Sequence, residues 1–113
     1  MDKQQLYTAL DSVNRQIDTN LQQLKLQVRE DLTGAENLVQ ILQNLLLQRQ
    51  NLLQPWLLLT SSEDGKQLQT QQQLTQDYAR RMVAFRQYYG DSLVTRKRNE
   101  RKLDVYKTLD AQR

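Results

Sequence analysis

The chain has 113 residues, with sixteen Lys and Arg against thirteen Asp and Glu, and it contains only three Gly and one Pro. Its length is that of one domain, and so few Gly and Pro exclude the frequent turns of a β-sandwich or barrel. The absence of His and Cys excludes disulfides, cysteine nucleophiles, histidine bases and zinc sites of the usual kind. Twenty-one Leu and nineteen Gln favour an all-α protein made of long helices.

The first predicted helix covers residues 3–32. Its apolar side chains recur at steps of three and four residues, and mostly polar side chains lie between them. A 3.5-residue repeat of this kind is typical of the seam of a coiled coil or of a helical hairpin. The stripe consists of Leu6, Leu10, Val13, Ile17, Leu21, Leu24, Val28 and Leu32.

The second predicted helix covers residues 35–54. We expect Gly34 to end the first helix, because Thr33 and Glu36 have the spacing of a capping box that starts a new one. Pro55 lacks an amide hydrogen and is expected to stop or kink this helix. The apolar face is wide, which predicts contact with two neighbours. It contains Leu38, Ile41, Leu42, Leu45, Leu52 and Trp56, widened by Val39, Leu46 and Leu53.

The third predicted helix covers residues 62–109 and follows a loop over residues 60–65. Ser61 or Ser62 can cap it, and Glu63 and Asp64 suit the positive end of its dipole. Gly90 allows a kink, although the apolar phase continues through it and favours one helix. The sequence therefore predicts a single helical domain, either an antiparallel three-helix bundle or a helical hairpin with a long third helix. The stripe contains Leu68, Leu74, Tyr78, Met82, Phe85, Tyr89 and Leu93, with Gln71 at a stripe position.

No catalytic constellation is visible in the sequence. The carboxylates are scattered along predicted polar faces, and the three Gly are isolated, so no phosphate-binding loop is present. We therefore expect a protein that is not an enzyme and that has no cofactor and no metal.

The basic C-terminal segment, residues 96–113, carries the net surplus of positive charge. It holds seven basic and three acidic residues, a net charge of +4, whereas residues 1–95 hold nine and ten, a net charge of −1. This segment could contact nucleic-acid phosphates or an acidic protein, or it could be a solvated helix end that complements the dipole. A body of net negative charge argues against a duplex. The basic patch is Arg96, Lys97, Arg98, Arg101 and Lys102.

A partner-binding groove is predicted between the second and third helices. Large apolar and aromatic side chains there offer area for a partner helix, since Trp and Tyr dominate interface energetics. The alternative for Trp56 is that it fills the end of the bundle. Gln16, Gln43 and Gln71 are candidates for hydrogen bonds between helices. The predicted groove is lined by Leu45, Leu52, Trp56, Phe85, Tyr89 and Leu93.

Residues 38–106 resemble the FliT-like flagellar export chaperones, which are small cytosolic α-helical proteins. The resemblance rests on a Leu-rich helix ending in residues 47–53 (LQRQNLL), a loop restarting at residues 62–64 (SED), and a long third helix ending in residues 101–106 (RKLDVY). It implies binding of a secreted filament-cap protein through its C-terminal helical segment, and contacts with the export apparatus. In some family members a terminal helix covers the apolar groove.

The sequence thus predicts a non-catalytic binding protein that masks an amphipathic helix of a secreted partner by helix-in-groove recognition. Residues 1–5 show no signal-peptide pattern and no apolar run is long enough to span a bilayer, so we expect a cytoplasmic protein without membrane insertion. Two alternatives stay open. One is a small nucleic-acid-associated protein that uses the basic patch, and the other is a coiled-coil homodimer formed through the stripe of the first helix.

Overall fold

The computed structural model describes residues 1–30 and 32–111, apart from the side chains of residues 28–30, 32–33, 92–97 and 99–111. This part of the chain forms α1 (Lys3–Glu30), α2 (Leu32–Leu59), a 3₁₀ turn η1 (Ser62–Asp64) and α3 (Gly65–Ala111), with no strand among these residues. The predicted all-α fold with three helices is confirmed. The chain divides into two compact units, Met1–Arg81 and Met82–Arg113.

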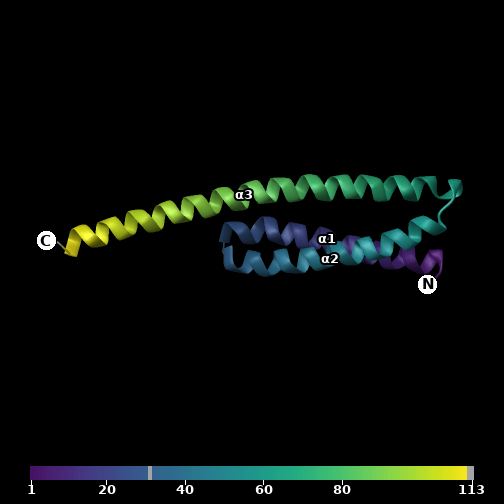
Figure 1. Cartoon of the computed structure of the whole chain (residues 1–113), viewed down its shortest axis with the longest axis horizontal. Coiled ribbons are helices and arrows are strands. Elements are labelled where there is room, and N and C mark those ends of the chain that lie inside the picture. The colour runs from purple at the N-terminus through teal and green to yellow at the C-terminus, as the bar shows by residue number, and fades with distance from the viewer. Residues whose placement is uncertain (31, 112–113) are drawn as a thin grey trace. The chain divides into compact units, whose positions relative to one another are not determined.

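The first unit is built on an antiparallel hairpin of α1 and α2. These two helices pack along their length, and the beginning of α3 runs beside them (Figure 1). The predicted stripe of α1 supplies the main core, as six of its residues are at most 7% exposed. Those residues are Leu6, Leu10, Val13, Ile17, Leu21 and Leu24.

The second helix begins earlier than the sequence predicts. Gly34 does not end the first helix but lies in the first turn of α2, which begins at Leu32. A Cβ atom at Gly34 would lie 2.6 Å from the Nε2 atom of Gln27. The glycine therefore leaves space for the end of the Gln27 side chain of α1, and its backbone does not adopt a positive φ.

Pro55 does not end α2, which continues to Leu59. Because proline has no amide hydrogen, α2 lacks the helical hydrogen bond from residue 55 to the carbonyl of Asn51. Asn51 is an exposed residue, so water can bond to its carbonyl instead. The next residue, Trp56, is fully buried, and the apolar area of its side chain favours helical continuation.

The described part of the second unit, residues 82–111, is the rest of α3. The helix passes through Gly90 without interruption, as the apolar phase of the sequence predicts.

Candidate functional site

Trp56 lies in the core of the first unit. It is 0% exposed and forms a cluster with Leu6 and Leu10, and its ring centroid is 5.5 Å from that of Tyr7. Partly buried side chains of Leu52, Leu53 and Leu68 pack against this cluster. The indole therefore joins all three helices and fills the end of the bundle, and in this structure it offers no surface to a partner.

The other predicted groove residues are divided between the two units. Leu45 is buried in the first unit. In the second unit Phe85 and Tyr89 stack on each other, with ring centroids 5.7 Å apart and an interplanar angle of 30°. The side chain of Leu93 lies outside the described residues. The contribution of Phe85, Tyr89 and Leu93 to a common groove stays a prediction.

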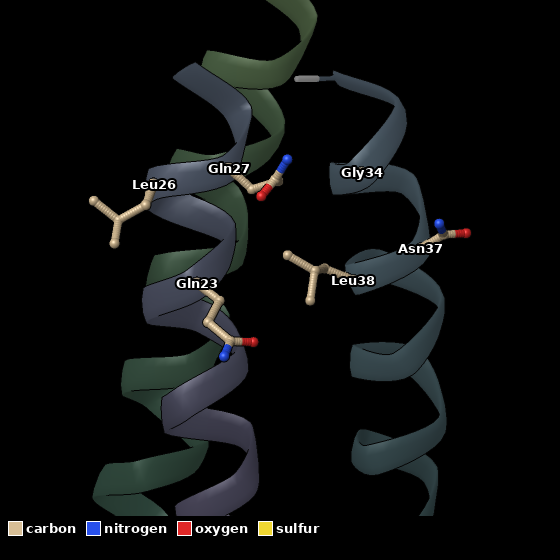
Figure 2. A pocket seen from close by; sticks show the side chains of 6 residues that line it. All are labelled: Gln23, Leu26, Gln27, Gly34, Asn37 and Leu38. Carbon is tan, nitrogen blue, oxygen red and sulfur yellow. The ribbon is translucent and has the colours of Figure 1, made fainter. Parts of the chain in front are cut away.

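An open groove instead runs between α1 and α2, and we call it the hairpin groove. Its apolar side consists of Leu38, Ile41 and Leu45, and Ile41 is 50% exposed. A second depression continues it toward the helical turn, since the two share Gln23 and Leu38. Figure 2 shows Leu38 projecting toward α1 in this second depression. The α1 side of the hairpin groove is polar and is formed by Arg15, Gln16, Thr19, Asn20 and Gln23.

The hairpin groove and residues 65–81 of α3 lie on different faces of the hairpin. Asn14 faces α3, because its side chain donates to Gln71 at 3.1 Å. Asn20 lines the groove and its Nδ2 donates to the carbonyl of Leu38 at 3.1 Å. Six residues separate the two asparagines, so their side chains leave α1 roughly 120° apart. Within the first unit, the groove face is therefore not the face that α3 covers.

The face of the hairpin toward α3 contains a buried arginine. Arg49 is 6% exposed, yet its guanidinium meets only uncharged groups in the described part of the chain. It donates to Asn14 Oδ1 at 2.8 Å, to Thr75 Oγ1 at 2.9 Å, and to the carbonyl and side-chain oxygens of Gln71 at 3.0 and 3.2 Å. Its Cζ lies 5.3 Å from the centroid of the Tyr78 ring.

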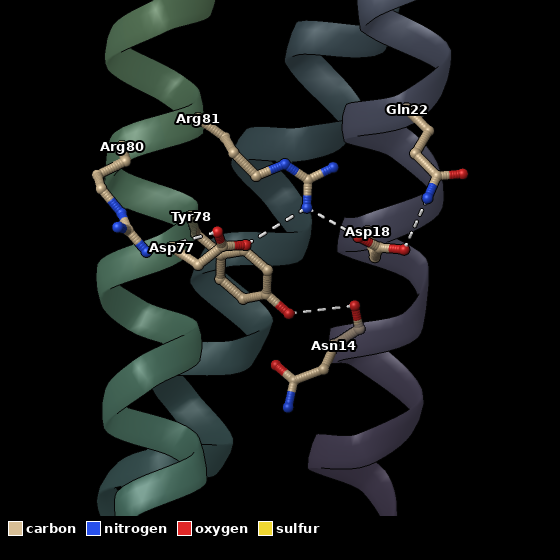
Figure 3. A network of polar contacts seen from close by, with 7 residues as sticks. All are labelled: Asn14, Asp18, Gln22, Asp77, Tyr78, Arg80 and Arg81. Atoms are coloured by element: carbon tan, nitrogen blue, oxygen red, sulfur yellow. Dashed lines mark hydrogen bonds and ion pairs between the residues drawn. The ribbon is translucent and has the colours of Figure 1, made fainter.

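Burial shapes the electrostatics of this cluster. It lowers the pKa of Arg49, although a guanidinium stays protonated at neutral pH. It also raises the pKa of Tyr78, whose hydroxyl donates to the carbonyl of Asn14 at 3.2 Å. Figure 3 shows that contact beside the ion pair of Arg81 and Asp18, which are 2.8 Å apart.

An ion pair and a hydrogen bond at Asp64 fix the start of α3 to α1. The ammonium of Lys3 lies 3.0 Å from Asp64, and the amide of Ser61 donates to the same carboxylate at 2.9 Å. The Ser61 amide, and after it Lys3, lower the pKa of Asp64. The loop therefore ends in a turn anchored to the N-terminal end of α1.

The basic patch lies in the second unit. Arg98 is exposed, while the side chains of the other four residues lie outside the described part of the chain. Its binding role stays a prediction.

Of the three glutamines proposed to bond between helices, Gln71 does so. Gln16 instead donates to Ser12 on its own helix, and Gln43 is exposed. The sequence reading missed Arg49. The signal was available, because Leu42, Leu45, Arg49, Leu52 and Trp56 follow one another at steps of three and four, which places the arginine on the buried seam.

No group of three or more acidic side chains with the geometry of a metal site occurs among the described residues. None of the described helices combines the length and the hydropathy needed to cross a membrane. No protein-family model, no curated protein and no solved structure matches the chain.

Proposed function

We propose that this chain is a non-catalytic, cytoplasmic binding protein that takes an amphipathic helix of a partner protein into the hairpin groove. The observation that carries the proposal is the half-exposed Ile41 beside the partly buried Leu38 and the buried Leu45, in a groove that the rest of the first unit leaves open. A helix laid into such a groove recognises it through apolar side chains spaced three and four residues apart.

The side chains at the rim of the hairpin groove are mostly polar but uncharged, which suits a partner helix whose flanks are polar. Gln16, Thr19 and Gln23 carry no charge, and the charge of Arg15 is paired with Asp11 at 2.8 Å. Uncharged amides and hydroxyls at a rim can bond to the polar flanks of a helix without repelling either sign of charge.

The resemblance of residues 38–106 to FliT-like export chaperones suggests the class of partner. We propose a secreted flagellar filament-cap protein or a similar export substrate, bound through its C-terminal helical segment before export. The hairpin groove would then cover an apolar surface that is prone to aggregate in the unpaired substrate.

The homodimer alternative has less support than the hairpin groove, because six apolar residues of the α1 stripe are already buried within one chain, in which α1 packs against α2. The nucleic-acid alternative stays open and is distinguished by salt, because phosphate contacts weaken by orders of magnitude between low and physiological salt.

The test compares two variants of α2 in capture experiments from nuclease-treated native cytosol at two salt concentrations, followed by affinity measurement with the purified partner. Ile41→Asp places a charge in the hairpin groove and should lower affinity at least about tenfold, since burial of such a side chain contributes about 1.5–3 kcal/mol.

Leu47→Asp is the matched control, because Leu47 is 57% exposed on the same helix and does not line the groove. It should bind like the wild type. Equal affinities for the two variants would contradict the groove. Capture that is lost at the higher salt, or that occurs only when the nuclease is left out, would favour the nucleic-acid alternative.

A further inference from the structure

The cluster around Arg49 differs from an ordinary buried ion pair. Charges are rarely buried without an opposite charge, because the interior replaces hydration poorly. Here the four hydrogen bonds of the guanidinium go to an amide oxygen, a hydroxyl and two oxygens of Gln71, and no described carboxylate pairs with it. A carboxylate is the group whose geometry fits a guanidinium best, through two parallel hydrogen bonds.

Most of these neutral groups come from α3. Gln71, Thr75 and Tyr78 surround the guanidinium from that helix, whereas Asn14 comes from α1. The only described side chains of α3 that are fully buried are Gln71 and Tyr78, and Leu68 and Leu74 are partly exposed. Polar contacts therefore hold a larger share of residues 65–81 of α3 than of the contact between α1 and α2, although Leu68 packs on the Trp56 cluster and the Tyr78 ring is buried.

We propose that Arg49 is a recognition point for an amphipathic helix that carries a carboxylate among its apolar side chains, and that such a helix takes the place of residues 65–81 of α3. The partner's Asp or Glu would lie where Gln71 lies and would neutralise the guanidinium. Water replaces the hydrogen bonds that α3 releases at small net cost, and apolar side chains of the partner helix would take over the packing of Leu68 on the Trp56 cluster and of the buried Tyr78. This inference rests on the proposed function in so far as the partner is a helix, but it concerns a different face of the hairpin.

The probe is a fluorescein-labelled peptide of residues 65–81, made with the native Gln71 and with Gln71→Glu, and titrated into the full chain while anisotropy is measured. We expect the Gln71→Glu peptide to bind at least tenfold more tightly than the native peptide at pH 7. The difference should vanish when the Glu is protonated at acidic pH.

Three variants of the full chain make the result specific. Arg49→Met should abolish the preference for the Gln71→Glu peptide, whereas Arg80→Met, which removes an arginine whose side chain is 78% exposed on α3, should leave it intact. Gln71→Glu within the full chain should weaken peptide binding, because its own α3 then competes better. Circular dichroism checks that each variant is folded. If Arg49→Met is unfolded, Arg49→Lys replaces it, because lysine keeps the positive charge but lacks the two parallel N–H donors of the guanidinium. With Arg49→Lys, the preference for the Gln71→Glu peptide should fall at least threefold.

Equal binding of the two peptides, no binding of the Gln71→Glu peptide, or a preference that survives the loss of the Arg49 guanidinium would overturn the inference. These outcomes are separable from those of the groove. If Ile41→Asp abolishes partner capture while the peptides show no preference, the hairpin groove stands and the Arg49 site does not.

Discussion

At the scale of single residues, polar side chains decide how α3 meets the hairpin. Asp64 accepts a hydrogen bond from the amide of Ser61 and pairs with Lys3, while Arg81 pairs with Asp18, so residues 65–81 of α3 are fixed to the hairpin at both ends. Between these ends, the hydrogen bond from Arg49 to Gln71 fixes the middle of the same segment. Hydrogen bonds have directions and fixed lengths, and they set the register of α3 more narrowly than an apolar stripe does.

The tie at Asp64 predicts a dependence on pH. Because its pKa is lower in the folded chain, Asp64 stabilises the fold above the pKa of the unfolded chain, about 3.9, and this contribution is lost as the pH falls through the lower folded value. Asp64→Asn should therefore lower the melting temperature at pH 7, and its difference from the wild type should shrink toward pH 2. Thermal melts at several pH values measure this, with Glu63→Gln at the neighbouring exposed carboxylate as control. A constant difference across the range would show that the charge of Asp64 is unimportant.

At the scale of helices, apolar periodicity predicts the elements well and their ends less well. The six buried residues of α1 match the predicted stripe. The two boundary residues, Gly34 and Pro55, are both inside α2. Gly and Pro disfavour a helix through their local backbone preferences, at a cost of about 1–3 kcal/mol each. This cost is smaller than the summed free energy gained by burying the apolar side chains of α2 on either side of them, so the helix continues.

Pro55 consequently lowers the stability of α2. Pro55→Ala restores the hydrogen bond to the carbonyl of Asn51 and relieves the ring, and it should raise the free energy of unfolding by about 1–3 kcal/mol. Urea titration followed by circular dichroism measures the change. Gln54→Ala, a change at the adjacent exposed position, should stay within about 0.5 kcal/mol of the wild type. A loss of stability in Pro55→Ala would mean that the packing of Trp56 depends on the geometry that the proline imposes.

At the scale of the whole molecule, the described core belongs to one part of the chain. Every fully buried side chain among the described residues lies at or before Tyr78, inside the unit Met1–Arg81. The second unit is a single helix, and isolated helices gain little stability without packing. Charge follows the same division, with the surplus of basic residues after residue 95.

A fragment of residues 1–81 should therefore fold cooperatively, with a melting temperature within a few degrees of that of the full chain. A peptide of residues 82–113 should show only partial helicity in water. Circular dichroism with thermal melting tests both fragments. A non-cooperative melt of residues 1–81 would show that α3 beyond Arg81 contributes to the core.

The sequence by itself determined the helical class, the number of helices and the buried face of α1, because a 3.6-residue period identifies which side chains share a face. It also marked Gln71 as a polar residue on a seam. Only the tertiary structure decided that Trp56 is core, that Arg49 lies among uncharged groups, and that an open groove lies between α1 and α2. Periodicity specifies a face but not the neighbour that covers it. In a chain whose helices have wide apolar faces, that neighbour is selected by the packing of all the helices together.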